Sequence, residues 1–504
     1  MNTLRILLCT LLFPASLFAQ LPAERSAYLA ARHERVAADS ALRFAGIPEL
    51  SAREQQLDAR MKALQGAMLA DYKAQHFFPP ARYFSQSKTH IESTRLFGVL
   101  RNMPKGGIQH LHVAAGGDAR WIAQRALTTP AAHIYWAPDT DMYTKGQLHC
   151  YFQGDAPEGF VQVAALQRQI PHLADSIVAR LTFDESIDAD SVDIWAEFEK
   201  VFQRLYGFIS YRPVFRAYTT AALDSLVADG VQHVEMRMFL ASRLYDEQHA
   251  SGEIPVDTLM AELRAIIADV QTREPAFTAK TIYTNLRFRD PEFLWEDMQK
   301  AIALRKRYPD LVTGYDLVAE EDNGHPTLHH LDNFLRLDSL EAAYGTDMPL
   351  YLHDGESNWA SVDNLYDAVL LGSRRIGHGF NLFRFPSLIE EVKQRDICLE
   401  VNPLSNQMLG YVRDLRIHPG SYYLAQGVRL SISSDDPLIF DYNGLSYDFW
   451  SIYLAWELDL RQIKQLCRNS LTYSVLEGEE KARALVAWET KWAQFVDETL
   501  ANWD

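Results

Sequence analysis

An apolar stretch near residue 350 ends in side chains that can do chemistry. Leu350-Tyr351-Leu352 is followed at once by His353, and Glu356 comes three residues later. An imidazole can bind a metal ion, and a carboxyl group can transfer a proton. Gly355 lies between the two and lets a ligand approach the backbone closely. This pattern favours a catalytic site, although a polar strand terminus without chemistry has the same pattern.

Two histidines near residue 110 offer further metal ligands. In a strand, residues i and i+2 point to the same face, so His110 and His112 can enter one pocket. His353 adds a third nitrogen donor, and Asp435 adds an oxygen donor. Three histidines and one aspartate with room for water suit a catalytic Zn²⁺, because a structural zinc site is closed. We therefore expect one Zn²⁺ per subunit at these four residues.

Three other polar residues are candidates for acid–base work. Glu356 can act as a general acid towards a bound substrate. His378 lies between two glycines and can orient a water molecule or take its proton. Asp436 can accept a hydrogen bond from the water or the substrate, although a turn and helix cap before Pro437 also explains this aspartate.

The elements that must position these residues alternate between strand and helix. Apolar, strand-like runs occur at 108–113, 231–239, 281–287, 312–318, 350–353, 375–378, 397–402 and 428–433. Most are separated by helical patterns, among them those at 328–344 and 359–371. This alternation predicts a (β/α)₈ barrel of the α/β class. An open doubly wound sheet is the alternative, but no G-x-G-x-x-G motif follows the first strand. Active sites of barrels gather at the C-terminal strand ends, where the polar residues above lie.

The rest of the chain flanks or interrupts this barrel. Residues 1–19 have a basic residue followed by an apolar run that is too short to span a bilayer. They resemble a signal peptide and predict a secreted or periplasmic protein. Residues 20–103 form a helical N-terminal extension, and 104–504 form the barrel, with an insertion at about 120–185.

Composition limits the partners. The net charge of −17 over 504 residues argues against binding to nucleic acid or to an anionic membrane surface. A small neutral or cationic substrate is compatible with this charge. The four cysteines include no C-x-x-C pair, and one of them lies in the predicted signal peptide. We expect neither a disulfide framework nor a thiolate metal site.

The order of the motifs resembles a known family. H-x-H, H-x-G-E, G-H-G and S-x-D-D are similar to the adenosine and AMP deaminases of the amidohydrolase superfamily. Further stretches resemble the secreted branch, the adenosine deaminase-related growth factors. They are residues 103–107, Trp195-x-x-Phe198-Glu199, residues 314–322 and Arg468-Asn469-Ser470.

The resemblance implies roles for these residues. Zinc is held by His110, His112, His353 and Asp435. Glu356 gives a proton to purine N1, and His378 is the base or the orienter of water. The implied substrate contacts are Asp436, Gly314, Gly355, Trp195, Phe198 and Glu199. The implied reaction converts adenosine, or a close 6-aminopurine nucleoside such as 2′-deoxyadenosine, to inosine and ammonia.

The chain departs from the family at two places. The family has an aspartate directly after H-x-H that contacts the sugar, where this chain has Val113. Animal members carry a disulfide in the insertion, where Cys150 has no evident partner. A different amine, amide or ester substrate therefore stays open, as does a non-catalytic purine-binding protein. The N-terminal helices and the resemblance also suggest a homodimer.

Three smaller features have ordinary explanations. Glu235 is expected to pair with Arg237 or a neighbour inside a strand. The histidines at 325, 329 and 330 resemble a second metal cluster, but a solvated loop favours surface histidines. Trp195 and Phe198 have the spacing of helical core residues, and only the resemblance suggests that they cover a substrate.

Overall fold

The computed structural model describes most of the chain. The described residues are 24–44, 46–184, 186–187, 193–240, 244–250, 252 and 254–503. The predicted signal peptide at 1–19 lies outside them. The chain divides into two compact units, Met1–Ala45 and Gly46–Asp504. Within the described residues, no helix has the length and apolar content needed to cross a membrane.

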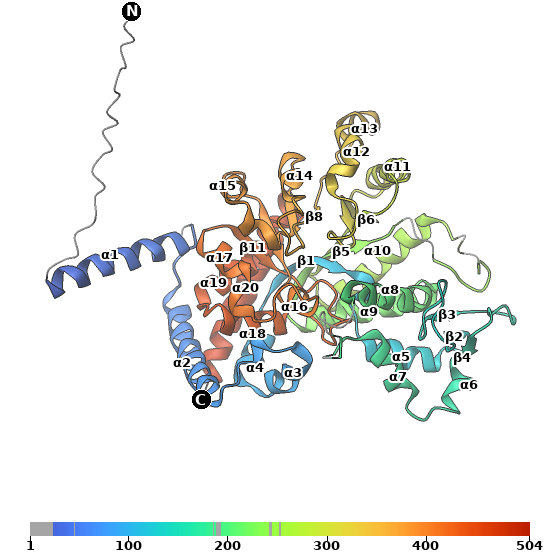
Figure 1. Cartoon of the computed structure of the whole chain (residues 1–504), viewed down its shortest axis with the longest axis horizontal. Coiled ribbons are helices and arrows are strands. Elements are labelled where there is room, and N and C mark those ends of the chain that lie inside the picture. The colour runs from blue at the N-terminus through green and yellow to red at the C-terminus, as the bar shows by residue number, and fades with distance from the viewer. Residues whose placement is uncertain are drawn as a thin grey trace, which may run out of the picture. The chain divides into compact units, whose positions relative to one another are not determined.

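The second unit is built around eight parallel strands (Figure 1). They are β1 (Gly106–His112), β5 (Val231–Met238), β6 (Thr278–Leu286), β7 (Val312–Val318), β8 (His353–Asp354), β9 (Arg375–His378), β10 (Cys398–Val401) and β11 (Arg429–Ile432). They form two four-stranded sheets, in the orders β1-β5-β6-β7 and β8-β9-β10-β11. All of these pairings are parallel, as expected when helices connect successive strands.

Backbone hydrogen bonds at two seams close the sheets into a barrel. At the first seam, the Asp435 amide donates to the His110 carbonyl at 3.2 Å, and the His112 amide donates to the Asp435 carbonyl at 3.1 Å. At the second seam, the Tyr315 amide donates to the Pro349 carbonyl at 2.9 Å, and the Tyr351 amide donates to the Tyr315 carbonyl at 3.0 Å. The predicted (β/α)₈ barrel is confirmed.

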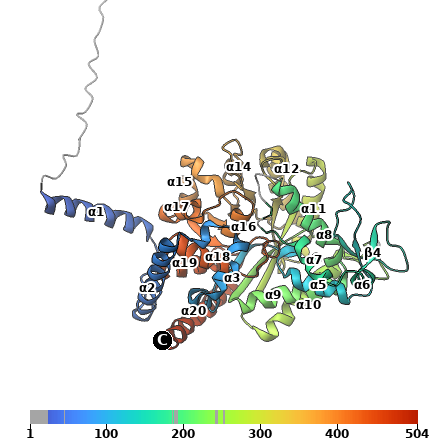
Figure 2. The ribbon, with the colours of Figure 1, turned by 60° about the horizontal axis from the view of Figure 1, so that its bottom comes forward.

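Helices follow most of the strands and cover the barrel (Figure 2). They are α8 (Ile194–Ile209), α9 (Arg212–Ala228), α10 (Val256–Arg273), α11 (Pro291–Arg307), η3 (Thr327–His330), α12 (Leu331–Leu335), α13 (Leu337–Tyr344), α14 (Leu365–Leu370), η4 (Phe380–Arg384), α15 (Pro386–Gln394), α16 (Pro403–Met408), η5 (Leu415–Ile417), α17 (Pro419–Ala425), α18 (Ser446–Ala455), α19 (Leu460–Thr472) and α20 (Gly478–Ala501). Strand β8 is shorter than its apolar run predicts, because residues 349–351 bond to β7 only around Tyr315.

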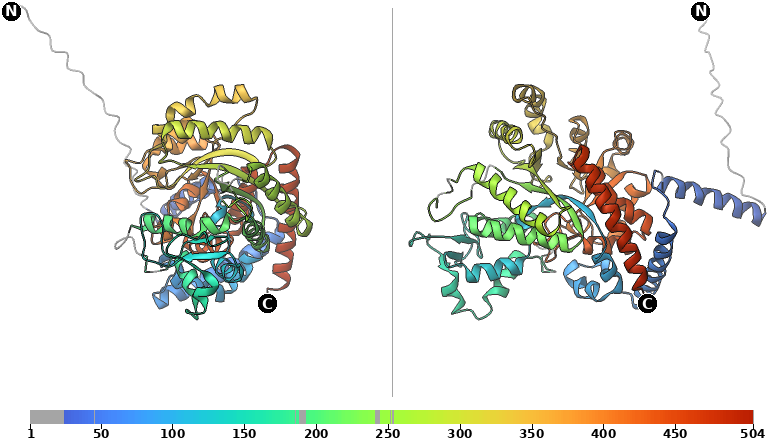
Figure 3. Two further views of the ribbon diagram at one scale, coloured as in Figure 1. Left: turned by 90° about the vertical axis from the view of Figure 1, so that its right-hand side faces the viewer. Right: turned by 180° about the vertical axis from the view of Figure 1, so that it is seen from behind.

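The segment after β1 forms a small subdomain. It contains α5 (Ala119–Thr128), α6 (Val163–Gln167), α7 (Leu173–Leu181) and an antiparallel sheet in the order β3-β2-β4. These strands are β2 (Ala132–Tyr135), β3 (Leu148–Cys150) and β4 (Phe160–Gln162). The sheet lies beside α8, as the side views show (Figure 3). Cys150 is buried and unpaired there, as are the other two described cysteines.

Several helices precede the barrel in the sequence. α1 (Arg25–Arg43) has no buried residue and belongs to the first compact unit. α2 (Ala52–Gln75), η1 (Pro79–Ala81), α3 (Phe84–Ser93) and α4 (Arg95–Arg101) belong to the same unit as the barrel. α2 begins at Ser51 with a capping box, in which the Ser51 and Glu54 side chains each accept from the other residue's backbone amide. Glu54 also accepts from the Trp492 indole at 2.8 Å, which fixes α2 against α20.

Candidate metal centre and active site

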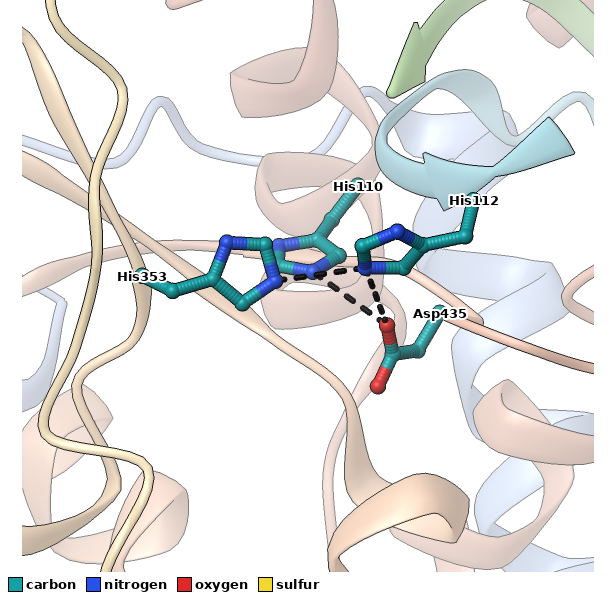
Figure 4. A group of neighbouring side chains, drawn as sticks. All are labelled: His110, His112, His353 and Asp435. Atoms are coloured by element: carbon teal, nitrogen blue, oxygen red, sulfur yellow. Dashed lines mark hydrogen bonds and ion pairs between the residues drawn. The ribbon is translucent and has the colours of Figure 1, made fainter. Parts of the chain in front are cut away.

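Four side chains converge at the C-terminal ends of the barrel strands (Figure 4). His110 and His112 lie on β1, His353 begins β8, and Asp435 follows β11. Each offers one ligand atom, and these atoms lie within 4.8 Å of one another. The structure thus brings together the four residues that the sequence predicts as metal ligands.

The distances within this group leave polar atoms without hydrogen-bond partners. The His110 Nε2 atom lies 3.2 Å from Asp435 Oδ1, and the Nε2 atoms of His112 and His353 lie 3.3 Å apart. Both His110 Nε2 and Asp435 Oδ1 are buried without a hydrogen bond. Burying such atoms is costly unless something binds them. Three imidazole nitrogens and one carboxylate oxygen fit Zn²⁺.

Burial also favours the ligand form of the imidazoles. Burial lowers the pKa of His112 to about 4, although the nearby Asp435 charge raises it. Burial and the neighbouring His110 lower the pKa of His353 well below its ordinary value. Both rings are therefore neutral at physiological pH and present a lone pair to a cation.

A second set of carboxylates fixes the ring orientation of two ligands. Glu400 accepts a hydrogen bond from His110 Nδ1 at 2.8 Å. Asp316 lies 2.7 Å from His353 Nδ1 and also accepts from the His353 amide at 2.8 Å. A proton held at Nδ1 leaves the Nε2 lone pair free, which is the usual arrangement behind metal-binding histidines.

Two buried arginines hold these carboxylates in place. Arg237 donates to Asp316 at 2.6 Å and to Glu400 at 2.7 Å. Arg375 donates to Glu400 at 2.7 Å and pairs with Glu235. The pair expected for Glu235 with Arg237 or a neighbour forms with Arg375 and with His233, whose Nε2 atom lies 3.2 Å from Glu235 Oε1, and not with Arg237. Burial raises the pKa of Glu400, but Arg237 and Arg375 hold it well below its ordinary value.

These supporting residues escaped the sequence analysis. Asp316 lies within an otherwise apolar strand, and so does Glu400. A charge inside a strand that packs on both faces needs a partner. A charged residue inside a buried strand therefore predicts a buried ion pair or hydrogen bond, but the sequence does not identify the partner.

Glu356 is held by its backbone and presents a free carboxyl group. The Glu356 and Gly355 amides donate to Glu321 at 2.7 and 3.0 Å, and Asn364 donates to the same carboxylate at 2.7 Å. Burial and the Asp435 charge raise the pKa of Glu356 well above its ordinary value. Its Oε1 atom has no hydrogen-bond partner. The raised pKa favours the protonated form of Glu356, which can act as a proton donor.

His378 and Asp435 both adopt left-handed backbone conformations, with φ of 59° and 62°. Such angles strain a residue that has a side chain, and they cluster at functional sites. The turn directs His378 Nδ1 to within 3.4 Å of Glu356 and Nε2 to within 3.7 Å of the Asp435 Oδ2 atom. Ser405 donates to the same Oδ2 atom at 2.7 Å. Burial lowers the pKa of His378 to about 3.

A cavity of about 740 Å³ opens beside these residues. Its volume lies in the range of small-molecule sites, roughly 300–1,000 Å³. His112, His353, Glu356 and the Asp435-Asp436 pair line one part of it. Asp436 Oδ1 is buried and has no hydrogen-bond partner, so this atom is available to a bound ligand.

Three predicted substrate contacts, Trp195, Phe198 and Glu199, line the cavity from α8. Trp195 donates from its indole to the Tyr411 hydroxyl at 2.9 Å, and its ring packs edge-on against Phe198. Among the described residues, no hydrogen bond or ion pair holds the Glu199 carboxyl group, and burial together with Glu320 raises its pKa. α8 thus lines the cavity with two aromatic side chains and one acidic side chain within about one helical turn.

Gly314 and Gly355 are not among the residues that line the cavity. A side chain at Gly314 would meet the Tyr351 ring and the Pro349 carbonyl, so this glycine allows β7 to approach the chain before β8. Gly355 has a φ of 86° and turns the chain between the metal ligand and Glu356. Its role is in backbone geometry.

Val113 lines the cavity next to His112, where the family's sugar contact would lie. Asp118 does not replace it, because its carboxylate caps α5 by accepting from the Trp121 amide at 2.6 Å. The histidines near residue 330 belong to neither metal-binding group found among the described residues. His330 is buried rather than on the surface, and its Nε2 atom bonds to the Arg287 carbonyl at 2.8 Å.

Solved structures of other proteins share this fold. The chain is similar to an adenine deaminase from Arthrobacter aurescens, with 19% identity and a TM-score of 0.55 over 78% of this chain and 99% of the other. It is also similar to a zinc-bound amidohydrolase from Burkhoderia ambifaria, with 18% identity and a TM-score of 0.56 over 84% and 100%. The fold is that of an amidohydrolase barrel.

Sequence comparisons give the family. The adenosine deaminase family model matches residues 144–488. Adenosine deaminase 2 of Homo sapiens is 32% identical over 90% of both chains. An adenosine deaminase of Lutzomyia longipalpis is 32% identical over 94% of this chain and 92% of the other. The chain belongs to the adenosine deaminase family and is a hydrolytic aminohydrolase, which confirms the resemblance drawn from its motifs.

Proposed function

We propose that this chain catalyses zinc-dependent hydrolytic deamination of adenosine, or of a close 6-aminopurine nucleoside such as 2′-deoxyadenosine. The products from adenosine are inosine and ammonia. Family membership supports the reaction. The observation that carries the proposal is the buried Glu356 carboxyl group beside the unpaired ligand atoms of His110 and Asp435.

The residues divide the work as follows. His110, His112, His353 and Asp435 hold Zn²⁺, which supplies a Lewis acid that lowers the pKa of water towards neutrality. Glu356 gives its proton to purine N1, so that C6 becomes more electrophilic. His378 faces the water that attacks C6, and Asp436 accepts a hydrogen bond from the substrate. Trp195 and Phe198 cover the nucleoside and exclude bulk water.

The apolar wall at Val113 favours a second candidate. A sugar hydroxyl placed against Val113 and Ala114 would lack an acceptor there, and an unpaired hydroxyl costs roughly 1–3 kcal/mol. A different amine, amide or ester substrate of the superfamily avoids that cost. The candidates separate when substrates that differ only in the sugar are compared.

The test measures ammonia release by the purified, zinc-loaded chain. Adenosine, 2′-deoxyadenosine, AMP and adenine are the substrates, and a chelator-treated sample and Glu356→Ala run beside them. We expect metal-dependent release from a nucleoside that the variant lacks. No release from any of the four would refute adenosine deamination and favour another superfamily substrate.

We also propose that the protein is secreted or periplasmic and forms a homodimer. The first part rests on the signal-like residues 1–19, and the second on the helical N-terminal extension. N-terminal sequencing of protein recovered from outside the cytoplasm tests the location. A mature chain that still begins at Met1 would contradict it. We expect no binding to nucleic acid or membranes, given the net charge of −17.

A further inference from the structure

A chain of hydrogen bonds ends on His378. The Gly420 amide donates to His418 Nδ1 at 3.0 Å. His418 Nε2 lies 3.1 Å from Asn406 Oδ1, and Asn406 Nδ2 lies 3.2 Å from His378 Nδ1. Asn406 is on α16, and His418 caps the N-terminus of α17. All of these residues are buried, so water does not compete for the bonds.

The direction of every bond follows from the first one. A backbone amide can only donate, so His418 Nδ1 accepts. Burial lowers the pKa of His418 to about 3, so its ring is neutral and carries its proton on Nε2. The His418 Nε2–H group therefore donates to Asn406 Oδ1. The other end of the same amide, Asn406 Nδ2, then faces His378 Nδ1 and donates to it. His378 Nδ1 is then an acceptor, and its own proton lies on Nε2.

The other groups around His378 agree with this assignment. Asn402 Nδ2 is 3.3 Å from both ring nitrogens, which places it over the ring face, where it favours neither tautomer. The Glu356 Oε1 atom lies 3.4 Å from Nδ1 but makes no hydrogen bond, so Asn406 provides the hydrogen bond in the plane of the ring at Nδ1. On the other side, Nε2 faces the Asp435 Oδ2 atom at 3.7 Å, which is an acceptor.

We propose that Asn406 and His418 are positioning residues that hold His378 as the Nε2–H tautomer. His378 then acts on the reacting water by donating a hydrogen bond from Nε2, not by taking a proton there. The catalytic part of this inference rests on the proposed deamination, whereas the tautomer does not. It decides between the two roles, base or orienter, that the sequence leaves open for His378.

Nitrogen NMR of the zinc-loaded protein tests the tautomer directly. The chain is labelled with ¹⁵N-histidine, and the His378 signals are those missing from His378→Gln. We expect a protonated Nε2 and an unprotonated Nδ1. Asn406→Asp should reverse the pattern, because a carboxylate accepts from Nδ1–H as well as from His418. A protonated Nδ1 in the unmodified chain, or no change in Asn406→Asp, would overturn the proposal.

Kinetics test the link through Asn406. We expect Asn406→Asp to lower kcat by roughly 10²-fold or more, with KM within about twofold. His418→Phe should also lower kcat, and His418→Gln should restore it, since its amide can donate to Asn406. In the Asn406→Asp background, His418→Phe should add no further loss. Additive losses would instead indicate a general structural role and overturn the proposal.

Asn333→Asp is the matched control, because Asn333 is a buried asparagine on α12 that bonds to the Pro291 carbonyl. It should leave kcat unchanged; an equal loss there would make the Asn406 effect nonspecific and count against the proposal. Failure of the proposed function is distinguishable. An unmodified chain that releases no ammonia from any nucleoside would still give the NMR pattern of the Nε2–H tautomer.

Discussion

Two buried glutamates near the metal ligands have pKa values shifted in opposite directions, and the neighbouring charges determine the direction of each shift. Burial raises the pKa of both. At Glu400, Arg237 and Arg375 outweigh burial, so this carboxylate is a permanent anion behind His110. At Glu356, the Asp435 charge adds to burial, and the pKa lies well above its ordinary value. Glu400 is therefore suited to stabilise the ligand set, and Glu356 is suited to the proton-donor role that we propose for it.

We predict that Glu356→Gln abolishes most of the activity without loss of metal. The amide fills the same space and keeps the backbone bonds to Glu321 but has no acidic proton. General acid catalysis contributes about 10²–10⁴-fold, and kcat should fall by that factor. Ammonia release and metal content are measured together. Glu498→Gln, at an exposed position on α20, is the control; loss of metal in Glu356→Gln would argue for a ligand role instead.

Asp316→Asn should weaken metal binding. The amide removes the charge that faces His353 Nδ1 and Arg237. Loss of a carboxylate behind a metal-binding histidine costs about 10–100-fold in metal affinity. Competition with a chelator gives the dissociation constant. Asp297→Asn is the control, because Asp297 is buried and bonds to the Tyr283 hydroxyl. Equal affinity in both variants would contradict the supporting role of Asp316.

The sequence predicts the ligands better than the residues that support them. His110 and His112 are two apart on a strand, and their chemical type alone indicates a metal. Asp316 and Glu400 matter only because β7 and β10 bring them behind His353 and His110. This placement depends on the register between strands that are far apart in the chain. The residue types alone do not predict that register.

At the scale of elements, the strand positions follow from apolar runs, while two helix predictions fail. The predicted helix at 359–371 is ordered as α14 only from Leu365. Asn381 donates to the Trp359 and Val362 carbonyls, which holds the first part of the segment in a loop. The predicted helix at 328–344 is split into η3, α12 and α13. The periodicity of a segment cannot show that a side chain distant in the sequence, here Asn381, will bind the backbone carbonyls that a helix would use.

Glu54 at the start of α2 gives a prediction about pH. Burial raises its pKa, but the Lys464 ammonium and its hydrogen bonds lower it below the ordinary 4.5. The stabilisation is therefore present above pH 4.5 and is lost as the pH falls through the folded-state pKa. Glu54→Gln should cost about 1–2 kcal/mol at neutral pH and less in acid.

Urea unfolding at pH 7 and at pH 4 measures this difference. Glu49→Gln is the control, because Glu49 is exposed and pairs with Arg461 on the surface. Surface pairs contribute little, about 0–1 kcal/mol. An equal cost of Glu54→Gln at both pH values would contradict the charge-based explanation.

At the scale of the molecule, α1 is a helix without a core of its own. No residue of α1 is buried, and Leu29 and Val36 are about half exposed on one face, seven residues apart. We predict that light scattering gives twice the mass of one chain. Val36→Glu should reduce the mass to one chain and leave kcat unchanged. Glu34→Gln on the same helix is the control, and a single-chain mass for the unmodified protein would refute the dimer.

The positions of the metal-binding residues relative to the two seams suggest that a bound metal ion would also stabilise the barrel. β1 belongs to one sheet and supplies His110 and His112, while His353 and Asp435 come from or follow the strands of the other sheet. The backbone bonds at each seam are few. An ion held by all four residues is therefore a cross-link between two halves of a closed cylinder. Metal bound at these four residues would stabilise the closed barrel against separation of its two sheets.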